Sequence, residues 1–271
     1  MKAYAEMTRD ELTAELKALK ETYKSYQKMD LNLDMSRGKP SVEQLDLSMG
    51  MMDVLSSESD LACEDGTDCR NYGVLTGVHE AKVLLGDMME TNPDNIIIYG
   101  NSSLNVMYDT VSRAMTHGIM GNTPWCKLDK VNQLRHVRFF GDIHGMIEHM
   151  KKHADILRPK FEMVENILED ELGELGIGEW TKPCGGYFLC FESLEGCAKA
   201  IVKRCKKCGV KMTPAGATWP YGKDPYDRDI RIAPSYPPVE DLKIATKLFA
   251  LSVKIVSAEK FLAQMQEEQT A

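Results

Sequence analysis

The sequence contains no apolar run of the length that a membrane-spanning helix requires. It also has no excess of positive charge, because 33 Lys and Arg residues stand against 41 Asp and Glu residues and give a net charge of −8. A chain this acidic is a poor candidate for binding nucleic acid or an anionic membrane. Residues 1–10 lack the apolar core of a signal peptide, so we expect a cytoplasmic protein.

Paired metal-binding motifs are also missing, although the chain has eight cysteines. Cys205 and Cys208 form one CxxC, but a structural zinc site would need a second pair or nearby histidines. His149 and His153 lack the adjacent glutamate of the zinc-protease pattern, and we interpret them as part of a solvated helix face. The cysteines are scattered through a chain long enough to build a core, so neither a disulfide framework nor a metal site is predicted.

The composition is that of a globular protein, with 43% hydrophobic and 27% charged residues and no internal repeat. The 271 residues are enough for one large domain or two ordinary ones. Strand and helix patterns alternate, which predicts an α/β fold followed by an α+β region. The expected strands are 31–35, 96–98, a turn and strand over 180–191, 210–213 and 230–233. One helix is expected after Thr8, a second over 80–89, and a long helical region from 131 onward. A new helix is expected to begin at Pro159, and two more to cover 198–208 and 240–266.

One strand–helix junction has the features of an anion site. Ile96 to Ile98 form a β-branched run after a turn signal, and the run ends at Gly100. The sequence Asn101-Ser102-Ser103 can then cap a helix with an apolar face formed by Leu104, Met107, Tyr108 and Val111. Free N–H groups and the positive end of a helix dipole favour a phosphate at such a place. The same residues are equally compatible with an ordinary helix cap.

Six short segments, taken together, resemble the pyridoxal-phosphate aminotransferases of fold type I, and among these the aspartate-aminotransferase-like, MocR-like branch. They occur in the family's order and reach both ends of the chain. The matching segments are Asp34-Met-Ser-Arg-Gly-Lys-Pro-Ser41, Arg70-Asn-Tyr-Gly-Val-Leu-Thr-Gly77, Gly100-Asn-Ser-Ser-Leu-Asn105, Pro183-Cys-Gly-Gly-Tyr-Phe188, Pro214-Ala-Gly-Ala-Thr218 and Ile230-Arg-Ile-Ala-Pro234.

The resemblance assigns roles to individual residues. It implies that Asn101, Ser102 and Ser103 hold the phosphate of pyridoxal 5'-phosphate, and that Tyr72 reaches the cofactor of a neighbouring subunit in a homodimer. Arg231 would bind the α-carboxylate of the substrate, because a planar guanidinium meets a carboxylate in two parallel hydrogen bonds. The resemblance also implies that Gly38 lines the substrate pocket and that Arg37 binds a second carboxylate of the substrate.

The same comparison exposes a gap in the middle of the chain. The family's Asn-Pro-Thr-Gly motif, the Asp that pairs with the cofactor ring and the Ser-x-x-Lys segment with the Schiff-base lysine do not occur between the matched flanks. The simplest hypothesis is an in-frame internal deletion with its junction near Lys130–Val131. We then expect a shortened large-domain sheet, exposed apolar helix faces and no catalytic lysine.

The expected organisation is an N-terminal helix and arm over 1–45, a remnant of the cofactor-binding domain over 46–130, and a long helix with the small domain over 131–271. Two functions remain open. By resemblance, the chain is an aminotransferase that moves an amino group between an aspartate-like amino acid and a 2-oxo acid, impaired by the missing lysine. The alternative is a non-catalytic remnant that dimerises or pairs with an intact relative.

Overall fold

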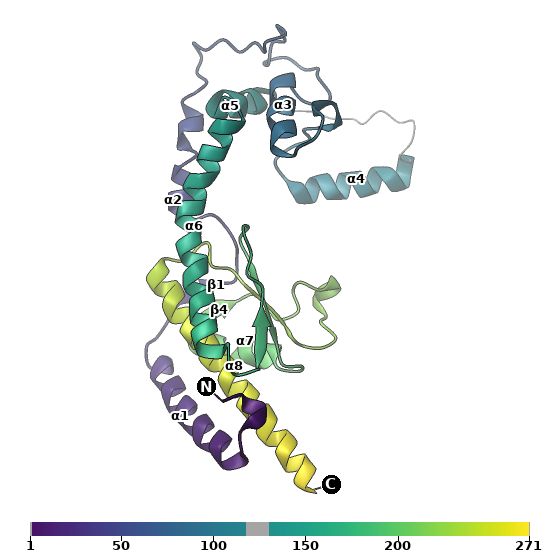
Figure 1. Ribbon diagram of the computed structural model, residues 1–271. Coiled ribbons are helices and arrows are strands. Elements are labelled where there is room, and N and C mark those ends of the chain that lie inside the picture. Colours follow the sequence, from purple (N-terminus) through teal and green to yellow (C-terminus); the bar gives the residue numbers. More distant parts are fainter. Residues whose placement is uncertain (1, 118–129, 271) are drawn as a thin grey trace. The chain divides into compact units, whose positions relative to one another are not determined.

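The computed structural model describes residues 2–117 and 130–270 and contains helices and two small sheets (Figure 1). Its internal contacts divide the chain into two units. Unit 1 comprises Met1–Gln44 and Ala154–Ala271, and unit 2 comprises Leu45–His153. Among the described residues, none of the helices combines the length and the apolarity needed to cross a membrane.

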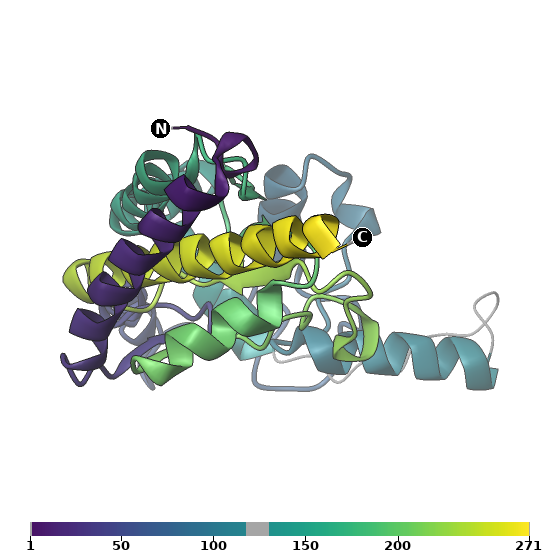
Figure 2. The same ribbon diagram turned by 90° about the horizontal axis from the view of Figure 1, so that it is seen from below.

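Unit 1 is built around the long C-terminal helix α8, Val239–Thr270. Helix α1, Arg9–Gln27, crosses α8, and α7, Ala198–Lys207, runs beside it (Figure 2). Glu259 of α8 joins the three helices, because its carboxylate pairs with Lys20 of α1 at 2.9 Å and with Arg204 of α7 at 2.9 Å. The N-terminal turn η1, Tyr4–Glu6, packs its buried Tyr4 into the same core.

Two sheets complete unit 1. Strands β1, Leu33–Met35, and β4, Val210–Met212, pair in parallel, with Leu33 opposite Val210. Strands β2, Gly178–Trp180, β3, Leu189–Ser193, and β5, Asp229–Ile232, form an antiparallel sheet in the order β2-β3-β5. Side chains alternate along β3 and β5, so Leu189, Phe191, Ile230 and Ile232 are buried against the helices. A short 3-10 turn, η4, Pro220–Gly222, lies in the loop before β5.

The prediction that Pro159 starts a new helix was wrong. Helix α6 runs without interruption over Ile143–Leu172, with Pro159 inside it. A proline in a helix interior removes one hydrogen bond and costs about 3 kcal/mol. The residues that follow offset this cost, because Val164, Leu168 and Leu172 are completely or almost completely buried in the core of unit 1.

A capping box is present at the start of α1, where the sequence predicts a helix after Thr8. The Thr8 hydroxyl accepts from the N–H of Glu11 at 3.3 Å, and the Glu11 carboxylate accepts from the N–H of Thr8 at 2.7 Å. We expect Thr8→Ala to lower the free energy of unfolding by about 1 kcal/mol, because the N–H of Glu11 loses its partner. Thr13→Ala, one turn later, is the matched control, since its hydroxyl only bonds back to the Arg9 carbonyl and its loss should be nearly neutral. If both substitutions lower the free energy of unfolding in urea equally, the capping box does not stabilise α1 as predicted.

Unit 2 consists of short helices. They are α2, Val42–Asp46, which starts in unit 1, followed by η2, Met49–Met52, α3, His79–Met88, η3, Pro93–Asn95, α4, Ser103–His117, α5, Lys130–Phe140, and the first part of α6. A small core forms where α3 meets α5, from Cys63, Cys69, Val78, Ala81 and Leu134. The side-chain amide oxygen of Gln133 accepts from the N–H of Val78 at 2.7 Å and ties α5 to the start of α3.

The prediction of a strand over 96–98 was wrong. Ile96 is buried, but the described residues of unit 2 include no strand that could pair with this segment. The N–H of Ile96 bonds back to the Pro93 carbonyl at 3.0 Å, and the N–H of Ile98 bonds to the Thr76 carbonyl at 3.0 Å. A single extended segment needs hydrogen-bonded neighbours on its edges to become part of a sheet. Three β-branched residues therefore stay irregular when neighbouring strands are not available.

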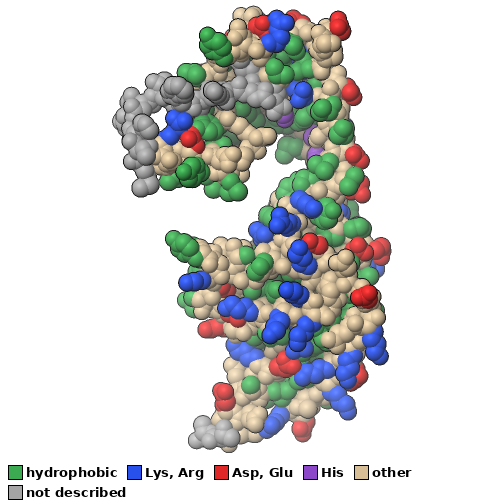
Figure 3. All heavy atoms as spheres, turned by 180° about the vertical axis from the view of Figure 1, so that it is seen from behind, with side chains coloured by type: hydrophobic (Ala, Val, Ile, Leu, Met, Phe, Trp, Pro, Cys, Tyr) green, Lys and Arg blue, Asp and Glu red, His purple; other side chains and the backbone are tan. Residues whose placement is uncertain are grey.

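The expected exposure of apolar helix faces is present in unit 2, where hydrophobic side chains reach the surface (Figure 3). Along α4, Leu104 is 73% exposed and Tyr108 is 77% exposed, and Met107 and Val111 are also exposed. A monomeric soluble protein rarely leaves one whole apolar helix face uncovered.

The cysteines that the structure describes are free thiols, as the scattered pattern predicts. The histidine pair differs from the prediction. His149 and His153 do not lie on a solvated face but are half-buried, and the ring of His149 packs edge-on against Phe139 and Phe140 of α5. No local pattern indicated this contact, because the two phenylalanines belong to the preceding helix.

Candidate functional site

The candidate substrate site of unit 1 lies where the parallel strands β1 and β4 end. Ser36 and Gly38 follow β1, and Thr213 follows β4. The hydroxyl of Thr213 donates to the Ser36 carbonyl at 2.5 Å and so joins the two strand ends. Ligand sites of α/β proteins are commonly found outside the carboxyl ends of parallel strands.

Arg231 reaches this place from β5. Side chains alternate along β5, so Arg231 points to the opposite side of the sheet from the buried Ile230 and Ile232. There its guanidinium donates to the Thr213 hydroxyl at 3.4 Å. Its Cζ atom lies 4.3 Å from the centre of the Phe188 ring, a cation–π contact that fixes the plane of the guanidinium. The Nε atom is buried and has no hydrogen-bond partner. A buried donor without a partner is costly, and a carboxylate would satisfy it.

Gly38 lies directly against the aromatic ring that supports Arg231. A Cβ at this position would approach Phe188 ring atoms to 2.4 and 2.5 Å, and the Cβ of Tyr187 to 2.9 Å. These distances are far below van der Waals contact, so any side chain at position 38 would displace Phe188. The role of Gly38 in a substrate pocket stays a prediction.

We expect Gly38→Ala to weaken carboxylate binding at Arg231 about tenfold, because the displaced Phe188 ring no longer holds the guanidinium. The overpacking itself should lower the free energy of unfolding by about 1–3 kcal/mol. Gly185→Ala is the matched control, since a Cβ there meets no atom within 4 Å. Titration of both variants with 2-oxoglutarate, followed by NMR, tests this; equal affinities would contradict the role of Gly38.

Arg37 is exposed beside Gly38. The structure describes no contact between Arg37 and Arg231, so its predicted role with a second carboxylate stays a prediction. Lys39, the next residue but one, lies with its Nζ atom 3.9 Å from the centre of the Tyr236 ring. Sequence reasoning assigned no role to Phe188 or Thr213. The available signal was that Phe188 ends the matched segment 183–188 and that Thr213 directly precedes the matched segment 214–218.

The predicted phosphate residues lie at the N-terminus of α4 in unit 2. The Ser102 carbonyl accepts from the N–H of Val106 at 3.0 Å, so Ser102 occupies the cap position, between Asn101 and Ser103. A Cβ at Gly100 would meet no atom within 4 Å, which leaves the approach to the helix end open. The 15-residue helix and its hydroxyl groups therefore fit a phosphate. Tyr72, predicted to serve a neighbouring subunit, is 97% exposed.

Fewer residues of this chain match those that would hold the ring of pyridoxal phosphate than match those that would hold its phosphate. The letters Ser-x-x-Lys occur outside the gap, at Ser36–Lys39 and Ser257–Lys260 among others, but in other surroundings. Lys260 is bound to the Glu195 carbonyl, and Lys39 lies over Tyr236. Of the two lysines near the proposed junction, Lys127 lies outside the described residues and Lys130 begins α5.

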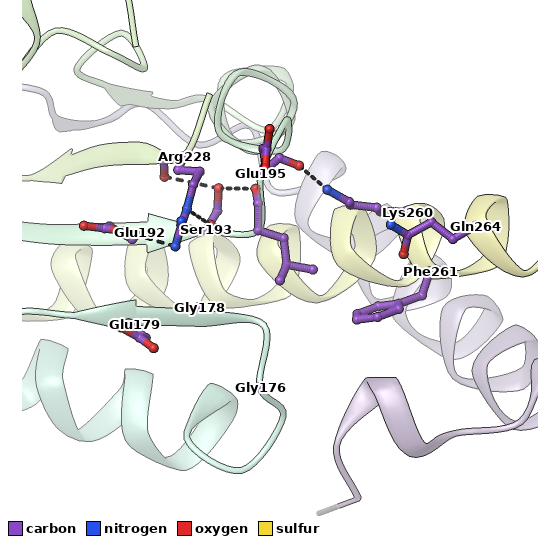
Figure 4. Close-up of a pocket in the computed structure, with 11 residues that line it drawn as sticks. Gly176, Gly178, Glu179, Glu192, Ser193, Glu195, Arg228, Lys260, Phe261 and Gln264 are labelled. Carbon is purple, nitrogen blue, oxygen red and sulfur yellow. Dashed lines mark hydrogen bonds and ion pairs between the residues drawn. The ribbon is translucent and has the colours of Figure 1, made fainter. Parts of the chain in front are cut away.

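A separate pocket of about 440 Å³ opens in unit 1 between β2, β3 and α8 (Figure 4). Its two cationic side chains already bind acceptors of the chain. Arg228 pairs with Glu192 at 3.2 Å, and Lys260 donates to the Glu195 carbonyl. Because these charges are satisfied, we assign no anionic ligand to this pocket.

Comparisons with known proteins identify relatives of this chain. A putative aminotransferase of Mycolicibacterium smegmatis is 25% identical over an alignment of 425 residues, which covers 96% of this chain and 99% of that protein. An aspartate aminotransferase of Corynebacterium glutamicum is 42% identical over 144 residues, which are 53% of this chain and 32% of that protein.

Two solved structures have a similar fold. An aspartate transaminase of Corynebacterium glutamicum superposes with a TM-score of 0.89 at 22% identity, over 96% of this chain and 99% of that one. LysN of Thermus thermophilus, an α-aminoadipate aminotransferase complexed with N-(5'-phosphopyridoxyl)-L-leucine, gives a TM-score of 0.51 at 10% identity, over 87% of this chain and 95% of that one. These likenesses confirm an α/β, fold-type-I aminotransferase-like fold with a shortened large domain.

The family model for aspartate amino-transferase matches the chain in two pieces, residues 7–131 and residues 126–266. These pieces cover most of the sequence and contain all six segments on which the resemblance was based. The chain therefore belongs to the aspartate aminotransferase family.

Proposed function

We propose that this chain retains the substrate-carboxylate site of an aminotransferase but carries out little or no transamination. The observation that carries the first half is the buried Nε of Arg231, which has no partner while the guanidinium is held by Phe188 and Thr213. An amino acid or a 2-oxo acid brings the carboxylate that this donor requires. Arg37 would bind the second carboxylate of an aspartate-like substrate.

The second half of the proposal concerns the cofactor. Asn101, Ser102 and Ser103 would hold the phosphate of pyridoxal phosphate at the start of α4, and Tyr72 would contribute from a neighbouring subunit. When bound, this cofactor supplies an electron sink for bonds at the substrate α-carbon. The LysN structure, with its phosphopyridoxyl ligand, supports the choice of cofactor. Transamination also needs a lysine that binds the cofactor covalently and moves the α-proton, and this chain has no such segment between its matched flanks.

An internal deletion accounts for that absence. Two observations support it: the two pieces of the family match meet at 126–131, and an alignment of 425 residues covers 96% of this 271-residue chain and 99% of its relative. The junction at Lys130–Val131 falls within the overlap. The predicted organisation into 1–45, 46–130 and 131–271 follows from placing the loss there.

Turnover of aspartate and 2-oxoglutarate tests the proposal directly. The purified chain, assayed with added pyridoxal phosphate, should show no transamination above a blank that contains free cofactor alone. Binding of 2-oxoglutarate, measured by NMR, should persist, whereas its dimethyl ester, which lacks both carboxylates, should not bind. Transamination above the blank would overturn the loss of activity, and equal binding of acid and ester would overturn the carboxylate site.

A second function is favoured by the exposed apolar face of α4. Leu104, Tyr108 and Val111 form a continuous stripe, and Tyr72 of the same unit is 97% exposed. A surface of this kind is suited to a protein partner, either a second copy of the chain or an intact relative. Size-exclusion chromatography with light scattering distinguishes a dimer from a monomer, and Tyr108→Lys should dissociate a dimer that uses this face.

A further inference from the structure

The pair His149 and His153 has a geometry that the aminotransferase reaction does not use. The two residues are one turn apart on α6, and their rings lie with centres 4.7 Å apart. The two Nε2 atoms lie 3.0 Å apart and share a hydrogen bond, in which either ring is the donor according to its tautomer. The Ser48 hydroxyl oxygen lies 3.3 Å from the Nε2 atom of His149, so three donor atoms converge.

The surroundings hold His149 in the orientation that this convergence needs. The ring packs edge-on against both Phe139 and Phe140, with its centre 5.4 Å from the first ring centre and 5.3 Å from the second. Burial, His153 and the charge of Lys152 lower the pKa of His149.

We propose that His149 and His153 form a binding site for a divalent late transition metal such as Cu²⁺ or Ni²⁺, with the Ser48 hydroxyl beside it. At metal–nitrogen distances of about 2.0–2.1 Å, two nitrogens 3.0 Å apart subtend an angle of about 95° at the metal. Square-planar and tetragonal sites have ligands at right angles, and these are the geometries of Cu²⁺ and Ni²⁺. Tetrahedral Zn²⁺ would separate the nitrogens by about 3.3 Å.

The site would be incomplete without solvent. No cluster of three or more His, Cys, Asp or Glu side chains that could hold a metal occurs in the part of the chain that the structure describes. Water would take the remaining positions, since both histidines are only half-buried. Lys152 contributes a positive charge on the same helix, which weakens the binding of a cation.

Titration of the full chain with Cu²⁺ tests the proposal, with glycine as a competing chelator that suppresses weaker surface binding. Electron paramagnetic resonance should show one Cu²⁺ per chain with nitrogen ligands. His153→Gln should weaken this binding at least tenfold, because it removes one ligand and leaves the packing of His149 against the phenylalanines intact. His149→Ala should abolish it.

His144→Ala is the matched control, since His144 is an exposed histidine of the same helix. It should leave the Cu²⁺ affinity unchanged. The proposal is overturned if His153→Gln binds Cu²⁺ like the unaltered chain, or if His144→Ala weakens binding as much as His153→Gln does. Thermal unfolding of each variant without metal shows whether it is folded, and His153→Gln keeps the test decisive should His149→Ala fail to fold.

Discussion

Replacing Arg231 with alanine should reduce the affinity for 2-oxoglutarate about 100-fold. The guanidinium is the one cation that the described contacts place against Phe188 and Thr213, and its buried Nε has no partner within the chain. Removal of a charge-assisted, two-bond contact with a carboxylate costs about 3 kcal/mol, and each 1.4 kcal/mol is a factor of ten in affinity.

Two further variants show whether this loss reflects recognition or only charge. Arg231→Lys keeps the positive charge but loses the planar fork, and we expect it to recover little of the affinity. Lys199→Ala removes an exposed cation of α7 that pairs with Asp227, and it should bind like the unaltered chain. NMR titration provides the affinities. An Arg231→Ala variant that is folded and still binds 2-oxoglutarate within threefold of the original would contradict the site.

Gly209→Ala should have the largest effect on stability, with a loss of about 4 kcal/mol in the free energy of unfolding. Gly209 follows α7 with φ of +81°, a conformation that a side chain disfavours by about 1–2 kcal/mol. A Cβ would also come within 1.6 Å of the Leu31 carbonyl oxygen. The clash involves backbone on both sides, and it lies beside the bond from the N–H of Leu33 to the Gly209 carbonyl that begins the pairing of β1 with β4.

Gly196→Ala separates these two causes. Gly196 also has a positive φ, +75°, but a Cβ there meets no atom within 4 Å. It should therefore cost only about 1–2 kcal/mol, from the backbone conformation alone. Urea unfolding of both variants gives the comparison. A Gly209→Ala protein no less stable than Gly196→Ala would mean that the close approach of β1 to the end of α7 is not a feature of the folded chain.

Local patterns predicted unit 1 well because its elements carry their own signals. The capping box at Thr8 marked the start of α1, and the apolar alternation around Arg231 marked β5. The role of Arg231 was implied by the family resemblance, and its place on a short apolar strand was consistent with that role. Its supporting ring, Phe188, was not predictable, because contact between β5 and the turn before β3 depends on the tertiary fold.

The failures have equally specific causes. Ile96 to Ile98 have strong strand propensity, yet a strand requires partners that the described part of unit 2 does not contain. Pro159 was expected to begin a helix, but burial of the following residues outweighs the lost hydrogen bond. His149 was expected to face solvent, and two phenylalanines from another helix cover it. Each error arose where a tertiary contact overrides a local preference.

The central claim is that the carboxylate site persists while covalent attachment of the cofactor is lost. Titration of the purified chain with pyridoxal phosphate, followed by borohydride reduction and peptide mapping, tests it most directly. We predict no Schiff-base absorbance band at one equivalent of cofactor, and only dispersed labelling of surface lysines. An absorbance band with stoichiometric labelling of one lysine, for example Lys39, Lys127 or Lys130, would contradict the claim. It would mean that this chain still binds the cofactor covalently, as an active aminotransferase does.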